Sequence, residues 1–209
     1  EFAISSHNKA HEAQKNGKLS EEIIPIGECK EDGNIRPNST QEKLDQLKLA
    51  FDTKGTVTAA TSSPLTDGAA ATIICEENYA KQNNLNILGR IVSTAVEGCD
   101  PDYMGLGPIG ASKKALMRAN LSIDKIDIFE LNEAFASQSL ACIKDLGIDQ
   151  KKVNIDGGAL ALGHPLGATG ARITGKAADL LRRENKKYAL STQCIGLGMG
   201  IATVIESVD

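Results

Sequence analysis

Apolar and amphipathic stretches alternate along most of this 209-residue chain. Short apolar runs bounded by turn residues predict strands, and longer runs with apolar positions three or four residues apart predict helices. We expect strands at 22–27, 56–60, 87–97, 126–131, 153–155, 188–192 and 200–206, and helices at 1–16, 41–49, 64–79, 109–119, 133–146 and 171–181. Strands that alternate with helices of these lengths predict a layered α/β domain.

Three polar side chains each stand next to a turn at the end of an apolar segment. Asn132 follows the strand expected at 126–131, His164 lies in the glycine-rich stretch 154–175, and Cys194 follows a short strand-like segment. Strand ends converge at one edge of an α/β sheet, where such folds carry their chemistry. A cysteine, a histidine and an asparagine together are a set suited to thiol chemistry. The spacing leaves open whether they meet, and a buried, hydrogen-bonded histidine in a tight connection is the alternative for His164.

Composition narrows the range of partners. A net charge of −4 gives no indication of nucleic acid or a membrane surface as a partner. No apolar run approaches about 18 residues, so we expect no membrane span. The five cysteines lack paired metal-ligand spacing, which predicts a reducing, cytoplasmic compartment and no metal site. His7 and His11 lie four residues apart on the first expected helix, and we expect them on a solvated face.

Several motifs of the chain resemble those of the thiolase family. Residues 132–135 (NEAF), 157–165 (GGALALGHP) and 194–196 (CIG) are similar to its three C-terminal signatures. Residues 58–71 are similar to its pantetheine-contacting loop and the helix after it. The resemblance is greatest to the 3-ketoacyl-CoA thiolases that form the β-subunit of bacterial fatty-acid oxidation complexes, and it rests on residues 98–101, 142–147 and 194–198.

The resemblance implies a mixed sheet with helices on both faces, a fold that the family repeats in two similar halves. Residues 1–54 correspond to part of the loop domain, and residues 55–209 to the C-terminal domain. The family's nucleophilic cysteine belongs to the N-terminal half, and this chain resembles the C-terminal half. The four cysteines before Cys194 do not sit in the nucleophile motif; they are Cys29, Cys75, Cys99 and Cys142.

The resemblance also implies roles for the three polar residues. His164 activates the nucleophilic cysteine and lines one oxyanion site, and Asn132 holds a water that completes this site. Cys194 protonates the departing enolate. The backbone N–H of Gly196 donates to the acyl-enzyme oxygen, which explains a small residue at that position.

Two further positions are implied to bind substrate. Ser63 hydrogen-bonds the pantetheine of CoA, although a turn and a helix cap without a ligand is the alternative reading of its segment. Phe135 is expected in the core or as a pocket wall. Glu133 either orients the water network of Asn132 or favours a helix N-terminus by its charge. CoA and acyl-CoA are implied as substrates, with no metal and no redox cofactor.

The implied function is thiolytic cleavage of a 3-ketoacyl-CoA in fatty-acid β-oxidation, a reaction in which an acyl group is transferred to CoA. The implied partners are the N-terminal thiolase half, a second copy of the full protein and a multifunctional α-subunit. We expect the 209-residue chain alone to be inactive. Two alternatives stay open: acetoacetyl-CoA synthesis by an enzyme of the same family, and a non-catalytic piece that binds CoA or serves assembly.

Overall fold

The core of the fold is one mixed four-stranded sheet. A computed structural model describes residues 1–208, and its sheet has the strand order β1-β4-β3-β2. The strands are β1 (Arg90–Gly98), β2 (Ile128–Leu131), β3 (Tyr188–Ile195) and β4 (Met199–Glu206). β4 is antiparallel to both β1 and β3, and β2 is parallel to β3. The carboxyl ends of β2 and β3 therefore lie at the same edge.

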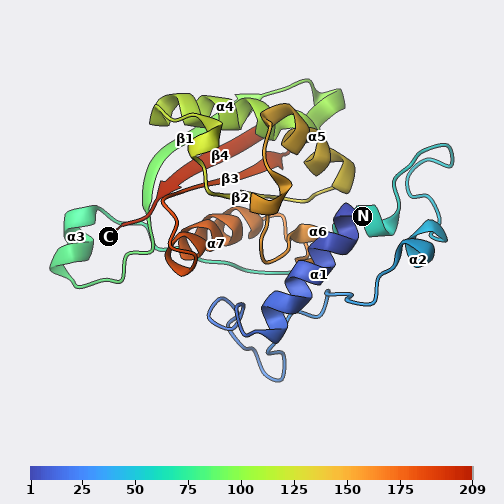
Figure 1. The fold of residues 1–209 in the computed structure, drawn as a ribbon, viewed down its shortest axis with the longest axis horizontal. Helices are drawn as coiled ribbons and strands as arrows, with labels where there is room; N and C mark the ends of the chain where they lie inside the picture. Colours follow the sequence, from blue (N-terminus) through green and yellow to red (C-terminus); the bar gives the residue numbers. More distant parts are fainter. Residues whose placement is uncertain (209) are drawn as a thin grey trace.

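Helices cover both faces of this sheet (Figure 1). One face packs against α4 (Gly107–Ala119) and α5 (Ala136–Leu146), and the other against α7 (Thr169–Arg183). Alternate residues of β2 serve the two sides, since Phe129 lies in the α4/α5 core and Ile128 in the α7 core. The predicted α/β fold with a mixed sheet and helices on both faces is confirmed.

The helix α7 is amphipathic, and its buried face contains one charged side chain. Ile173, Ala177 and Leu180 recur at helical spacing and are buried against the sheet. Lys176 on the same face is only 4% exposed. It forms ion pairs with Asp156, at 2.5 Å, and with Glu22, so its buried charge is compensated.

The N-terminal helix α1 (Phe2–Lys15) lies beside the short helix α6 (Ala159–Leu162), which leads into His164 (Figure 1). Ala3 and Leu160 are both buried in the small cluster between them. The remaining helical segments are α2 (Gln41–Asp45), α3 (Glu77–Gln82), η1 (Ala59–Thr61), η2 (Pro101–Leu106), η3 (Ile123–Lys125) and η4 (Gln150–Lys152).

The helix predicted at 64–79 is wrong. Residues 64–76 form no regular element, and only α3 at the end of the range is helical. Leu65, Ile73 and Ile74 in this segment are 103%, 93% and 73% exposed. The alanine-rich pattern favours a helix, but helix propensity is weak unless an apolar face is buried, and here no surface of residues 1–208 covers one.

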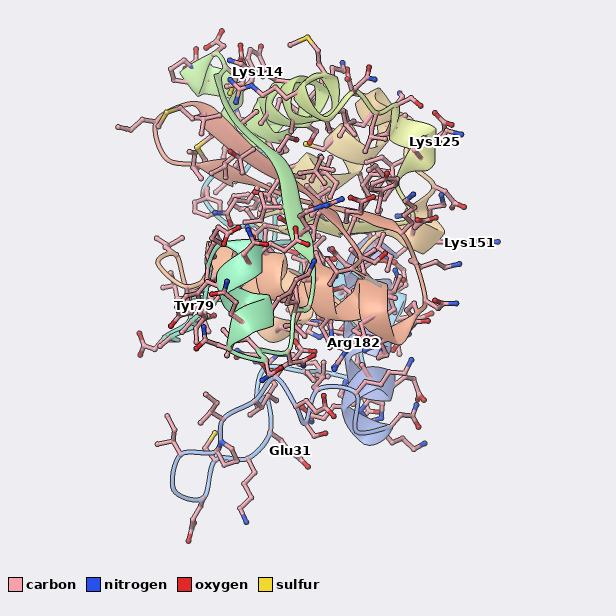
Figure 2. The ribbon with its side chains drawn as sticks, turned by 90° about the vertical axis from the view of Figure 1, so that its left-hand side faces the viewer. Glu31, Tyr79, Lys114, Lys125, Lys151 and Arg182 are labelled. Atoms are coloured by element: carbon pink, nitrogen blue, oxygen red, sulfur yellow. The ribbon has the colours of Figure 1, made fainter. Side chains whose placement is uncertain are left out.

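Several other local predictions also fail. The strand expected at 22–27 is a loop with one isolated bridge, and Figure 2 shows the following residues, marked by Glu31, projecting from the body. The strands expected at 56–60 and 153–155 are likewise reduced to single bridges. The helix expected at 41–49 ends at Asp45. These segments are polar or short, and few neighbours reinforce them.

No helix among residues 1–208 is long and apolar enough to cross a membrane.

The expected solvated face of the first helix is wrong for His7, which is 8% exposed. Its Nδ1 accepts a hydrogen bond of 3.1 Å from the backbone N–H of Arg36. Burial, and secondarily Arg36, lowers the pKa of His7 below its ordinary value. This histidine therefore ties the 32–36 loop to α1.

Candidate active site

Asn132 and His164, 32 residues apart in the chain, lie in contact. Asn132 follows β2, and its backbone N–H donates to the carbonyl of Thr192 on β3 at 2.9 Å. His164 follows α6 and Gly163, whose φ of 92° is a backbone state that glycine adopts readily. The Asn132 Nδ2 atom lies 3.3 Å from His164 Nε2. The Asn132 side chain is buried, and its Oδ1 has no partner among residues 1–208.

The hydroxyl of Thr169 determines which nitrogen of His164 carries the hydrogen. Thr169 Oγ1 donates to the carbonyl of Pro165 at 3.0 Å and lies 2.7 Å from His164 Nδ1. Because a hydroxyl has a single hydrogen, Thr169 accepts from Nδ1–H. The lone pair of the imidazole is then on Nε2, at the Asn132 side. This arrangement presents a base toward Asn132.

Burial lowers the pKa of His164 below its ordinary value of 6.5, and the nearby Arg172 lowers it further. Both effects disfavour a second positive charge in the half-buried site. The imidazole is therefore neutral at neutral pH, as a general base requires.

Cys194 lies at the same edge of the sheet as Asn132. Leu131 on β2 is paired with Thr192 on β3, so the ends of these parallel strands run side by side toward Asn132 and Cys194. Burial raises the pKa of the Cys194 thiol above its ordinary value of 9.0, which keeps it protonated at neutral pH. Within residues 1–208 no hydrogen bond joins Cys194 to His164 or Asn132.

Ser63 and Phe135 are brought together beside this site. The backbone N–H of Ser63 donates to the carbonyl of Ala134 at 3.0 Å, and Ser62 forms an isolated bridge with Phe135. The Phe135 ring is half-buried and meets Phe51 edge-on, with ring centroids 6.2 Å apart. Phe135 thus places half-buried aromatic surface near Ser63.

Gly196 lies in the turn between β3 and β4. It is exposed, and a Cβ added there would meet no atom within 4 Å. Crowding within residues 1–208 therefore does not explain the glycine. Its predicted role as a backbone donor stays a prediction.

Sequence reasoning missed two threonines that hold His164. Thr169 binds the ring, and Thr66 Oγ1 accepts from the His164 backbone N–H at 3.3 Å. A Cβ at Gly163 would come within 2.4 Å of the Thr66 side chain, so the two segments pack closely. Thr66 is 98 residues from His164 in the chain, and no local pattern marks such a pair. Thr169 lies within five residues of His164 and could have been considered.

A fully buried carboxyl group, that of Glu130 on β2, lies near the site. Glu130 is 1% exposed, and its Oε1 has no hydrogen-bond partner among residues 1–208. Burial raises the pKa of Glu130 to about 8, against the opposing charges of Arg172 and Lys176. Its carboxyl group is therefore partly or fully protonated near neutral pH.

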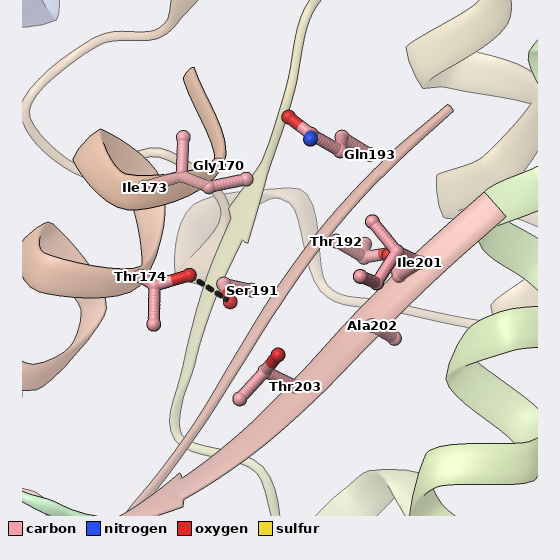
Figure 3. A pocket seen from close by; sticks show the side chains of 9 residues that line it. All are labelled: Gly170, Ile173, Thr174, Ser191, Thr192, Gln193, Ile201, Ala202 and Thr203. Atoms are coloured by element: carbon pink, nitrogen blue, oxygen red, sulfur yellow. Dashed lines mark hydrogen bonds between the residues drawn. The ribbon is translucent and has the colours of Figure 1, made fainter. Parts of the chain in front are cut away.

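A small pocket of about 180 Å³ lies between α7 and the β3–β4 pair (Figure 3). The hydroxyls of Thr174 and Ser191 meet across it at 3.2 Å. Gln193, next to Cys194, lines its far end, and its Oε1 is buried without a partner among the described residues. Within residues 1–208 no three His, Cys, Asp or Glu side chains gather in a way that could hold a metal ion.

The fold and the site together define an α/β protein with a neutral histidine base, an amide and a protonated thiol at the carboxyl ends of two parallel strands. Comparison with known protein families identifies the family to which this chain belongs. The family model "Thiolase, C-terminal domain" matches residues 85–207, and "Thiolase, N-terminal domain" matches residues 1–78. The chain belongs to the thiolase family. The domain boundary predicted at 54/55 stays a prediction; the two matches adjoin between residues 78 and 85.

Similar proteins agree with this assignment. The chain is 50% identical to a 3-ketoacyl-CoA thiolase of Vibrio vulnificus over 219 aligned positions, which cover 99% of this chain and 57% of that protein. It is 51% identical to a 3-ketoacyl-CoA thiolase of Marinobacter nauticus, covering 100% of this chain and 56% of the relative. The chain therefore spans little more than half the length of these relatives.

Solved structures of the family superpose closely. The crystal structure of the Bacillus anthracis acetyl-CoA acetyltransferase matches with a TM-score of 0.95 at 40% identity, covering 99% of this chain and 55% of that one. A human mitochondrial 3-ketoacyl-CoA thiolase in complex with CoA matches with a TM-score of 0.93 at 42% identity, covering 99% and 53%.

Proposed function

We propose that this chain is the C-terminal portion of a 3-ketoacyl-CoA thiolase, which cleaves its substrate with the thiol of CoA. The observation that carries the proposal is the contact of Asn132 with the lone-pair nitrogen of His164, at the strand ends where Cys194 also lies. The names of the similar proteins support the same substrate class.

In the proposed reaction a cysteine thiolate, supplied by the part of the protein outside this chain, attacks the 3-keto carbon. His164 Nε2 takes the proton of that thiol. The bond between the second and third carbons then breaks, and its electron pair leaves as the enolate of acetyl-CoA. The Cys194 thiol protonates this enolate. The acyl-enzyme that remains transfers its acyl group to the sulfur of a second CoA; the thiol of this CoA gives its proton to the Cys194 thiolate left by the previous step, and the nucleophilic cysteine leaves as a thiolate.

Asn132 and Gly196 are proposed to supply hydrogen-bond donors to the oxygen atoms on which negative charge develops. His164 and a water on Asn132 serve one oxyanion, and the backbone N–H of Gly196 serves the acyl-enzyme oxygen. The buried, unpartnered Oδ1 of Asn132 supports a polar partner such as water at this point. A thiol nucleophile, a base and an acid suffice for each step, so CoA and acyl-CoA enter as substrates and no metal or redox cofactor is required.

Ser63 and Phe135 are proposed to contact the pantetheine of CoA. Their adjacency supports this role, because the backbone of Ser63 is bonded to that of Ala134, directly before the half-buried ring of Phe135. One solved relative was crystallised with CoA.

The proposed partners are the N-terminal thiolase half, a second copy of the full protein and a multifunctional α-subunit. Leu65, Ile73 and Ile74 have exposed apolar side chains, which supports the proposal that another protein surface covers this segment in the full protein. We propose fatty-acid β-oxidation in the cytoplasm as the setting, since all five cysteines are free thiols.

Acetoacetyl-CoA synthesis is the second candidate, favoured by the likeness to an acetyl-CoA acetyltransferase structure. Thiolysis rates for 3-ketoacyl-CoA substrates of four to sixteen carbons, measured on the assembled protein, separate the two. Activity across the long chains supports the degradative enzyme, and activity confined to acetoacetyl-CoA supports the biosynthetic one. Calorimetric titration of CoA into the 209-residue chain further distinguishes a ligand-binding half from a purely assembling piece.

A further inference from the structure

Glu133, directly after Asn132, has a buried carboxylate that accepts hydrogen bonds from three separate segments. Glu133 as a whole is only 2% exposed. Oε2 accepts from the Ser6 hydroxyl of α1 at 2.6 Å and from the Leu160 backbone N–H at 3.1 Å. Oε1 accepts from Asn154 Nδ2 at 2.8 Å. All three partners are donors, which matches an ionised, acceptor-only carboxylate.

The chain closes tightly around this carboxylate. A Cβ at Gly158 would lie 2.2–2.5 Å from the carboxyl atoms of Glu133, so no larger residue fits. The Gly158 backbone N–H also donates to Ser6 Oγ at 3.0 Å. Burial raises the pKa of Glu133, whereas its hydrogen-bond donors and the charge of Lys9 oppose that rise.

Two of the three partners of Glu133, Asn154 and Leu160, connect to the two members of the Asn132–His164 contact. Asn154 bonds both the N–H and the carbonyl of Leu131, and so holds the end of β2 from which Asn132 projects. Leu160 lies in the first turn of α6, and this helix ends directly before Gly163 and His164. One carboxylate therefore binds the backbone that leads to His164 directly, and it holds the backbone that leads to Asn132 through the side chain of Asn154.

We propose that Glu133 is the positioning residue that holds Asn132 against Nε2 of His164. It does so as a negative acceptor shared by α1, the 154–158 turn and α6. Neither sequence-based alternative describes this role: the carboxylate serves the start of α6 rather than of its own helix α5 (Ala136–Leu146). The inference rests on the proposed thiolase reaction only for its effect on rate.

The test replaces the carboxylate by an amide of the same shape. Glu133→Gln directs an NH₂ group toward groups that are themselves donors, so at least one bond is lost and the backbone shifts. The matched control is Glu28→Gln, an exposed glutamate in the projecting loop. Nitrogen NMR of the imidazoles in the 209-residue chain reports the tautomer and the titration of His164.

In the unaltered chain and in Glu28→Gln we expect His164 as the Nδ1–H tautomer, titrating below 6.5. In Glu133→Gln we expect the Nε2 resonance to shift, because the Asn132 amide no longer donates to this nitrogen, and the midpoint to move toward 6.5; Thr169 keeps the hydrogen on Nδ1. A His164 spectrum unchanged in folded Glu133→Gln would overturn the proposal. Should that variant fail to fold, Ser6→Ala removes one donor and leaves the carboxylate in place. We then expect the same change in the His164 spectrum, but smaller. An unchanged His164 spectrum in Ser6→Ala would contradict the proposal.

Activity gives an independent readout on the assembled protein. Glu133→Gln is expected to lower kcat by about 10- to 100-fold with little change in KM, as loss of alignment does. A rise in KM at unchanged kcat would contradict a positioning role. The NMR signature needs no turnover, so a shifted His164 in a protein without thiolase activity would sink the proposed function and leave the positioning of His164 by Glu133 intact.

Discussion

The Asn132 amide donates to the one nitrogen of His164 that has a free lone pair. The 3.3 Å separation of Asn132 Nδ2 and His164 Nε2 is long for a hydrogen bond, so the contact is weak and can yield to another donor. Thr169 holds the opposite ring nitrogen at 2.7 Å. The ring is thus oriented firmly from one side and available on the other, which suits a base that must accept a proton from a thiol.

Replacing Asn132 with alanine should lower kcat for thiolysis by about 10²- to 10³-fold and leave KM within a few-fold, because the water proposed to lie on Asn132 donates to the oxyanion mainly in the transition state. Steady-state kinetics of the assembled protein measure this. Ser137→Ala, an exposed change on α5, serves as the control. A loss confined to KM would mean that Asn132 contributes to binding alone.

Replacing Arg172 with methionine should raise the pKa of His164, because the positive charge that disfavours imidazolium is removed. The value should stay below 6.5, since burial, the larger cause, remains. NMR titration of His164 checks this, with Arg182→Met on the exposed part of the same helix as the control. An equal shift in both variants would argue against a local effect of Arg172.

Glu130 should make the protein less stable at alkaline pH. Its pKa is raised from 4.5 to about 8 in the fold, so the native state holds a proton that the unfolded chain releases. This contribution is fully present below pH 4.5 and is lost as pH rises through 8, by at most about 1.4 kcal/mol per pH unit. Glu130→Gln has no such titration.

The quantity that tests this is the free energy of unfolding of Glu130→Gln minus that of the unaltered chain, measured by urea denaturation at several pH values. The difference should grow in favour of the variant between pH 5 and pH 8 and level off above. A difference independent of pH would show that Glu130 titrates normally.

Gly158→Ala should destabilise the fold by about 1–3 kcal/mol, because its methyl group would overlap the Glu133 carboxylate and the closely packed chain has no space to yield. Gly167→Ala, in the loop after His164, meets no atom within 4 Å and should change stability by less than about 0.5 kcal/mol. Thermal unfolding of both variants gives the comparison, and equal midpoints would mean that the 158 region relaxes freely.

The parts of the fold that sequence reasoning predicted are those whose pattern and packing agree. The helix at α7 follows from the spacing of Ile173, Ala177 and Leu180, and the same residues are buried against the sheet. Strands β3 and β4 follow likewise from short apolar runs that end in turns. Residues 64–76 lack such agreement, because their apolar side chains have no partner surface among residues 1–208.

The site was accessible to sequence reasoning only as far as its motifs extend. Asn132 and His164 stand out by their position after apolar segments, whereas their contact depends on how β2 and α6 are placed by the fold. Thr66 and Ser6 contribute through contacts with residues far away in the chain. No local pattern distinguishes such residues from ordinary polar surface.

The most direct test of the central claim is thiolysis of a 3-ketoacyl-CoA by the 209-residue chain, with and without an added N-terminal thiolase half. We expect no activity from the chain alone and recovery on mixing, with the recovered activity abolished by His164→Ala or Cys194→Ala. That result would mean that these residues act on a nucleophile supplied by the other half. Activity of the chain alone would mean that one of its own cysteines is acylated, and it would contradict the assignment of the nucleophile to the other half.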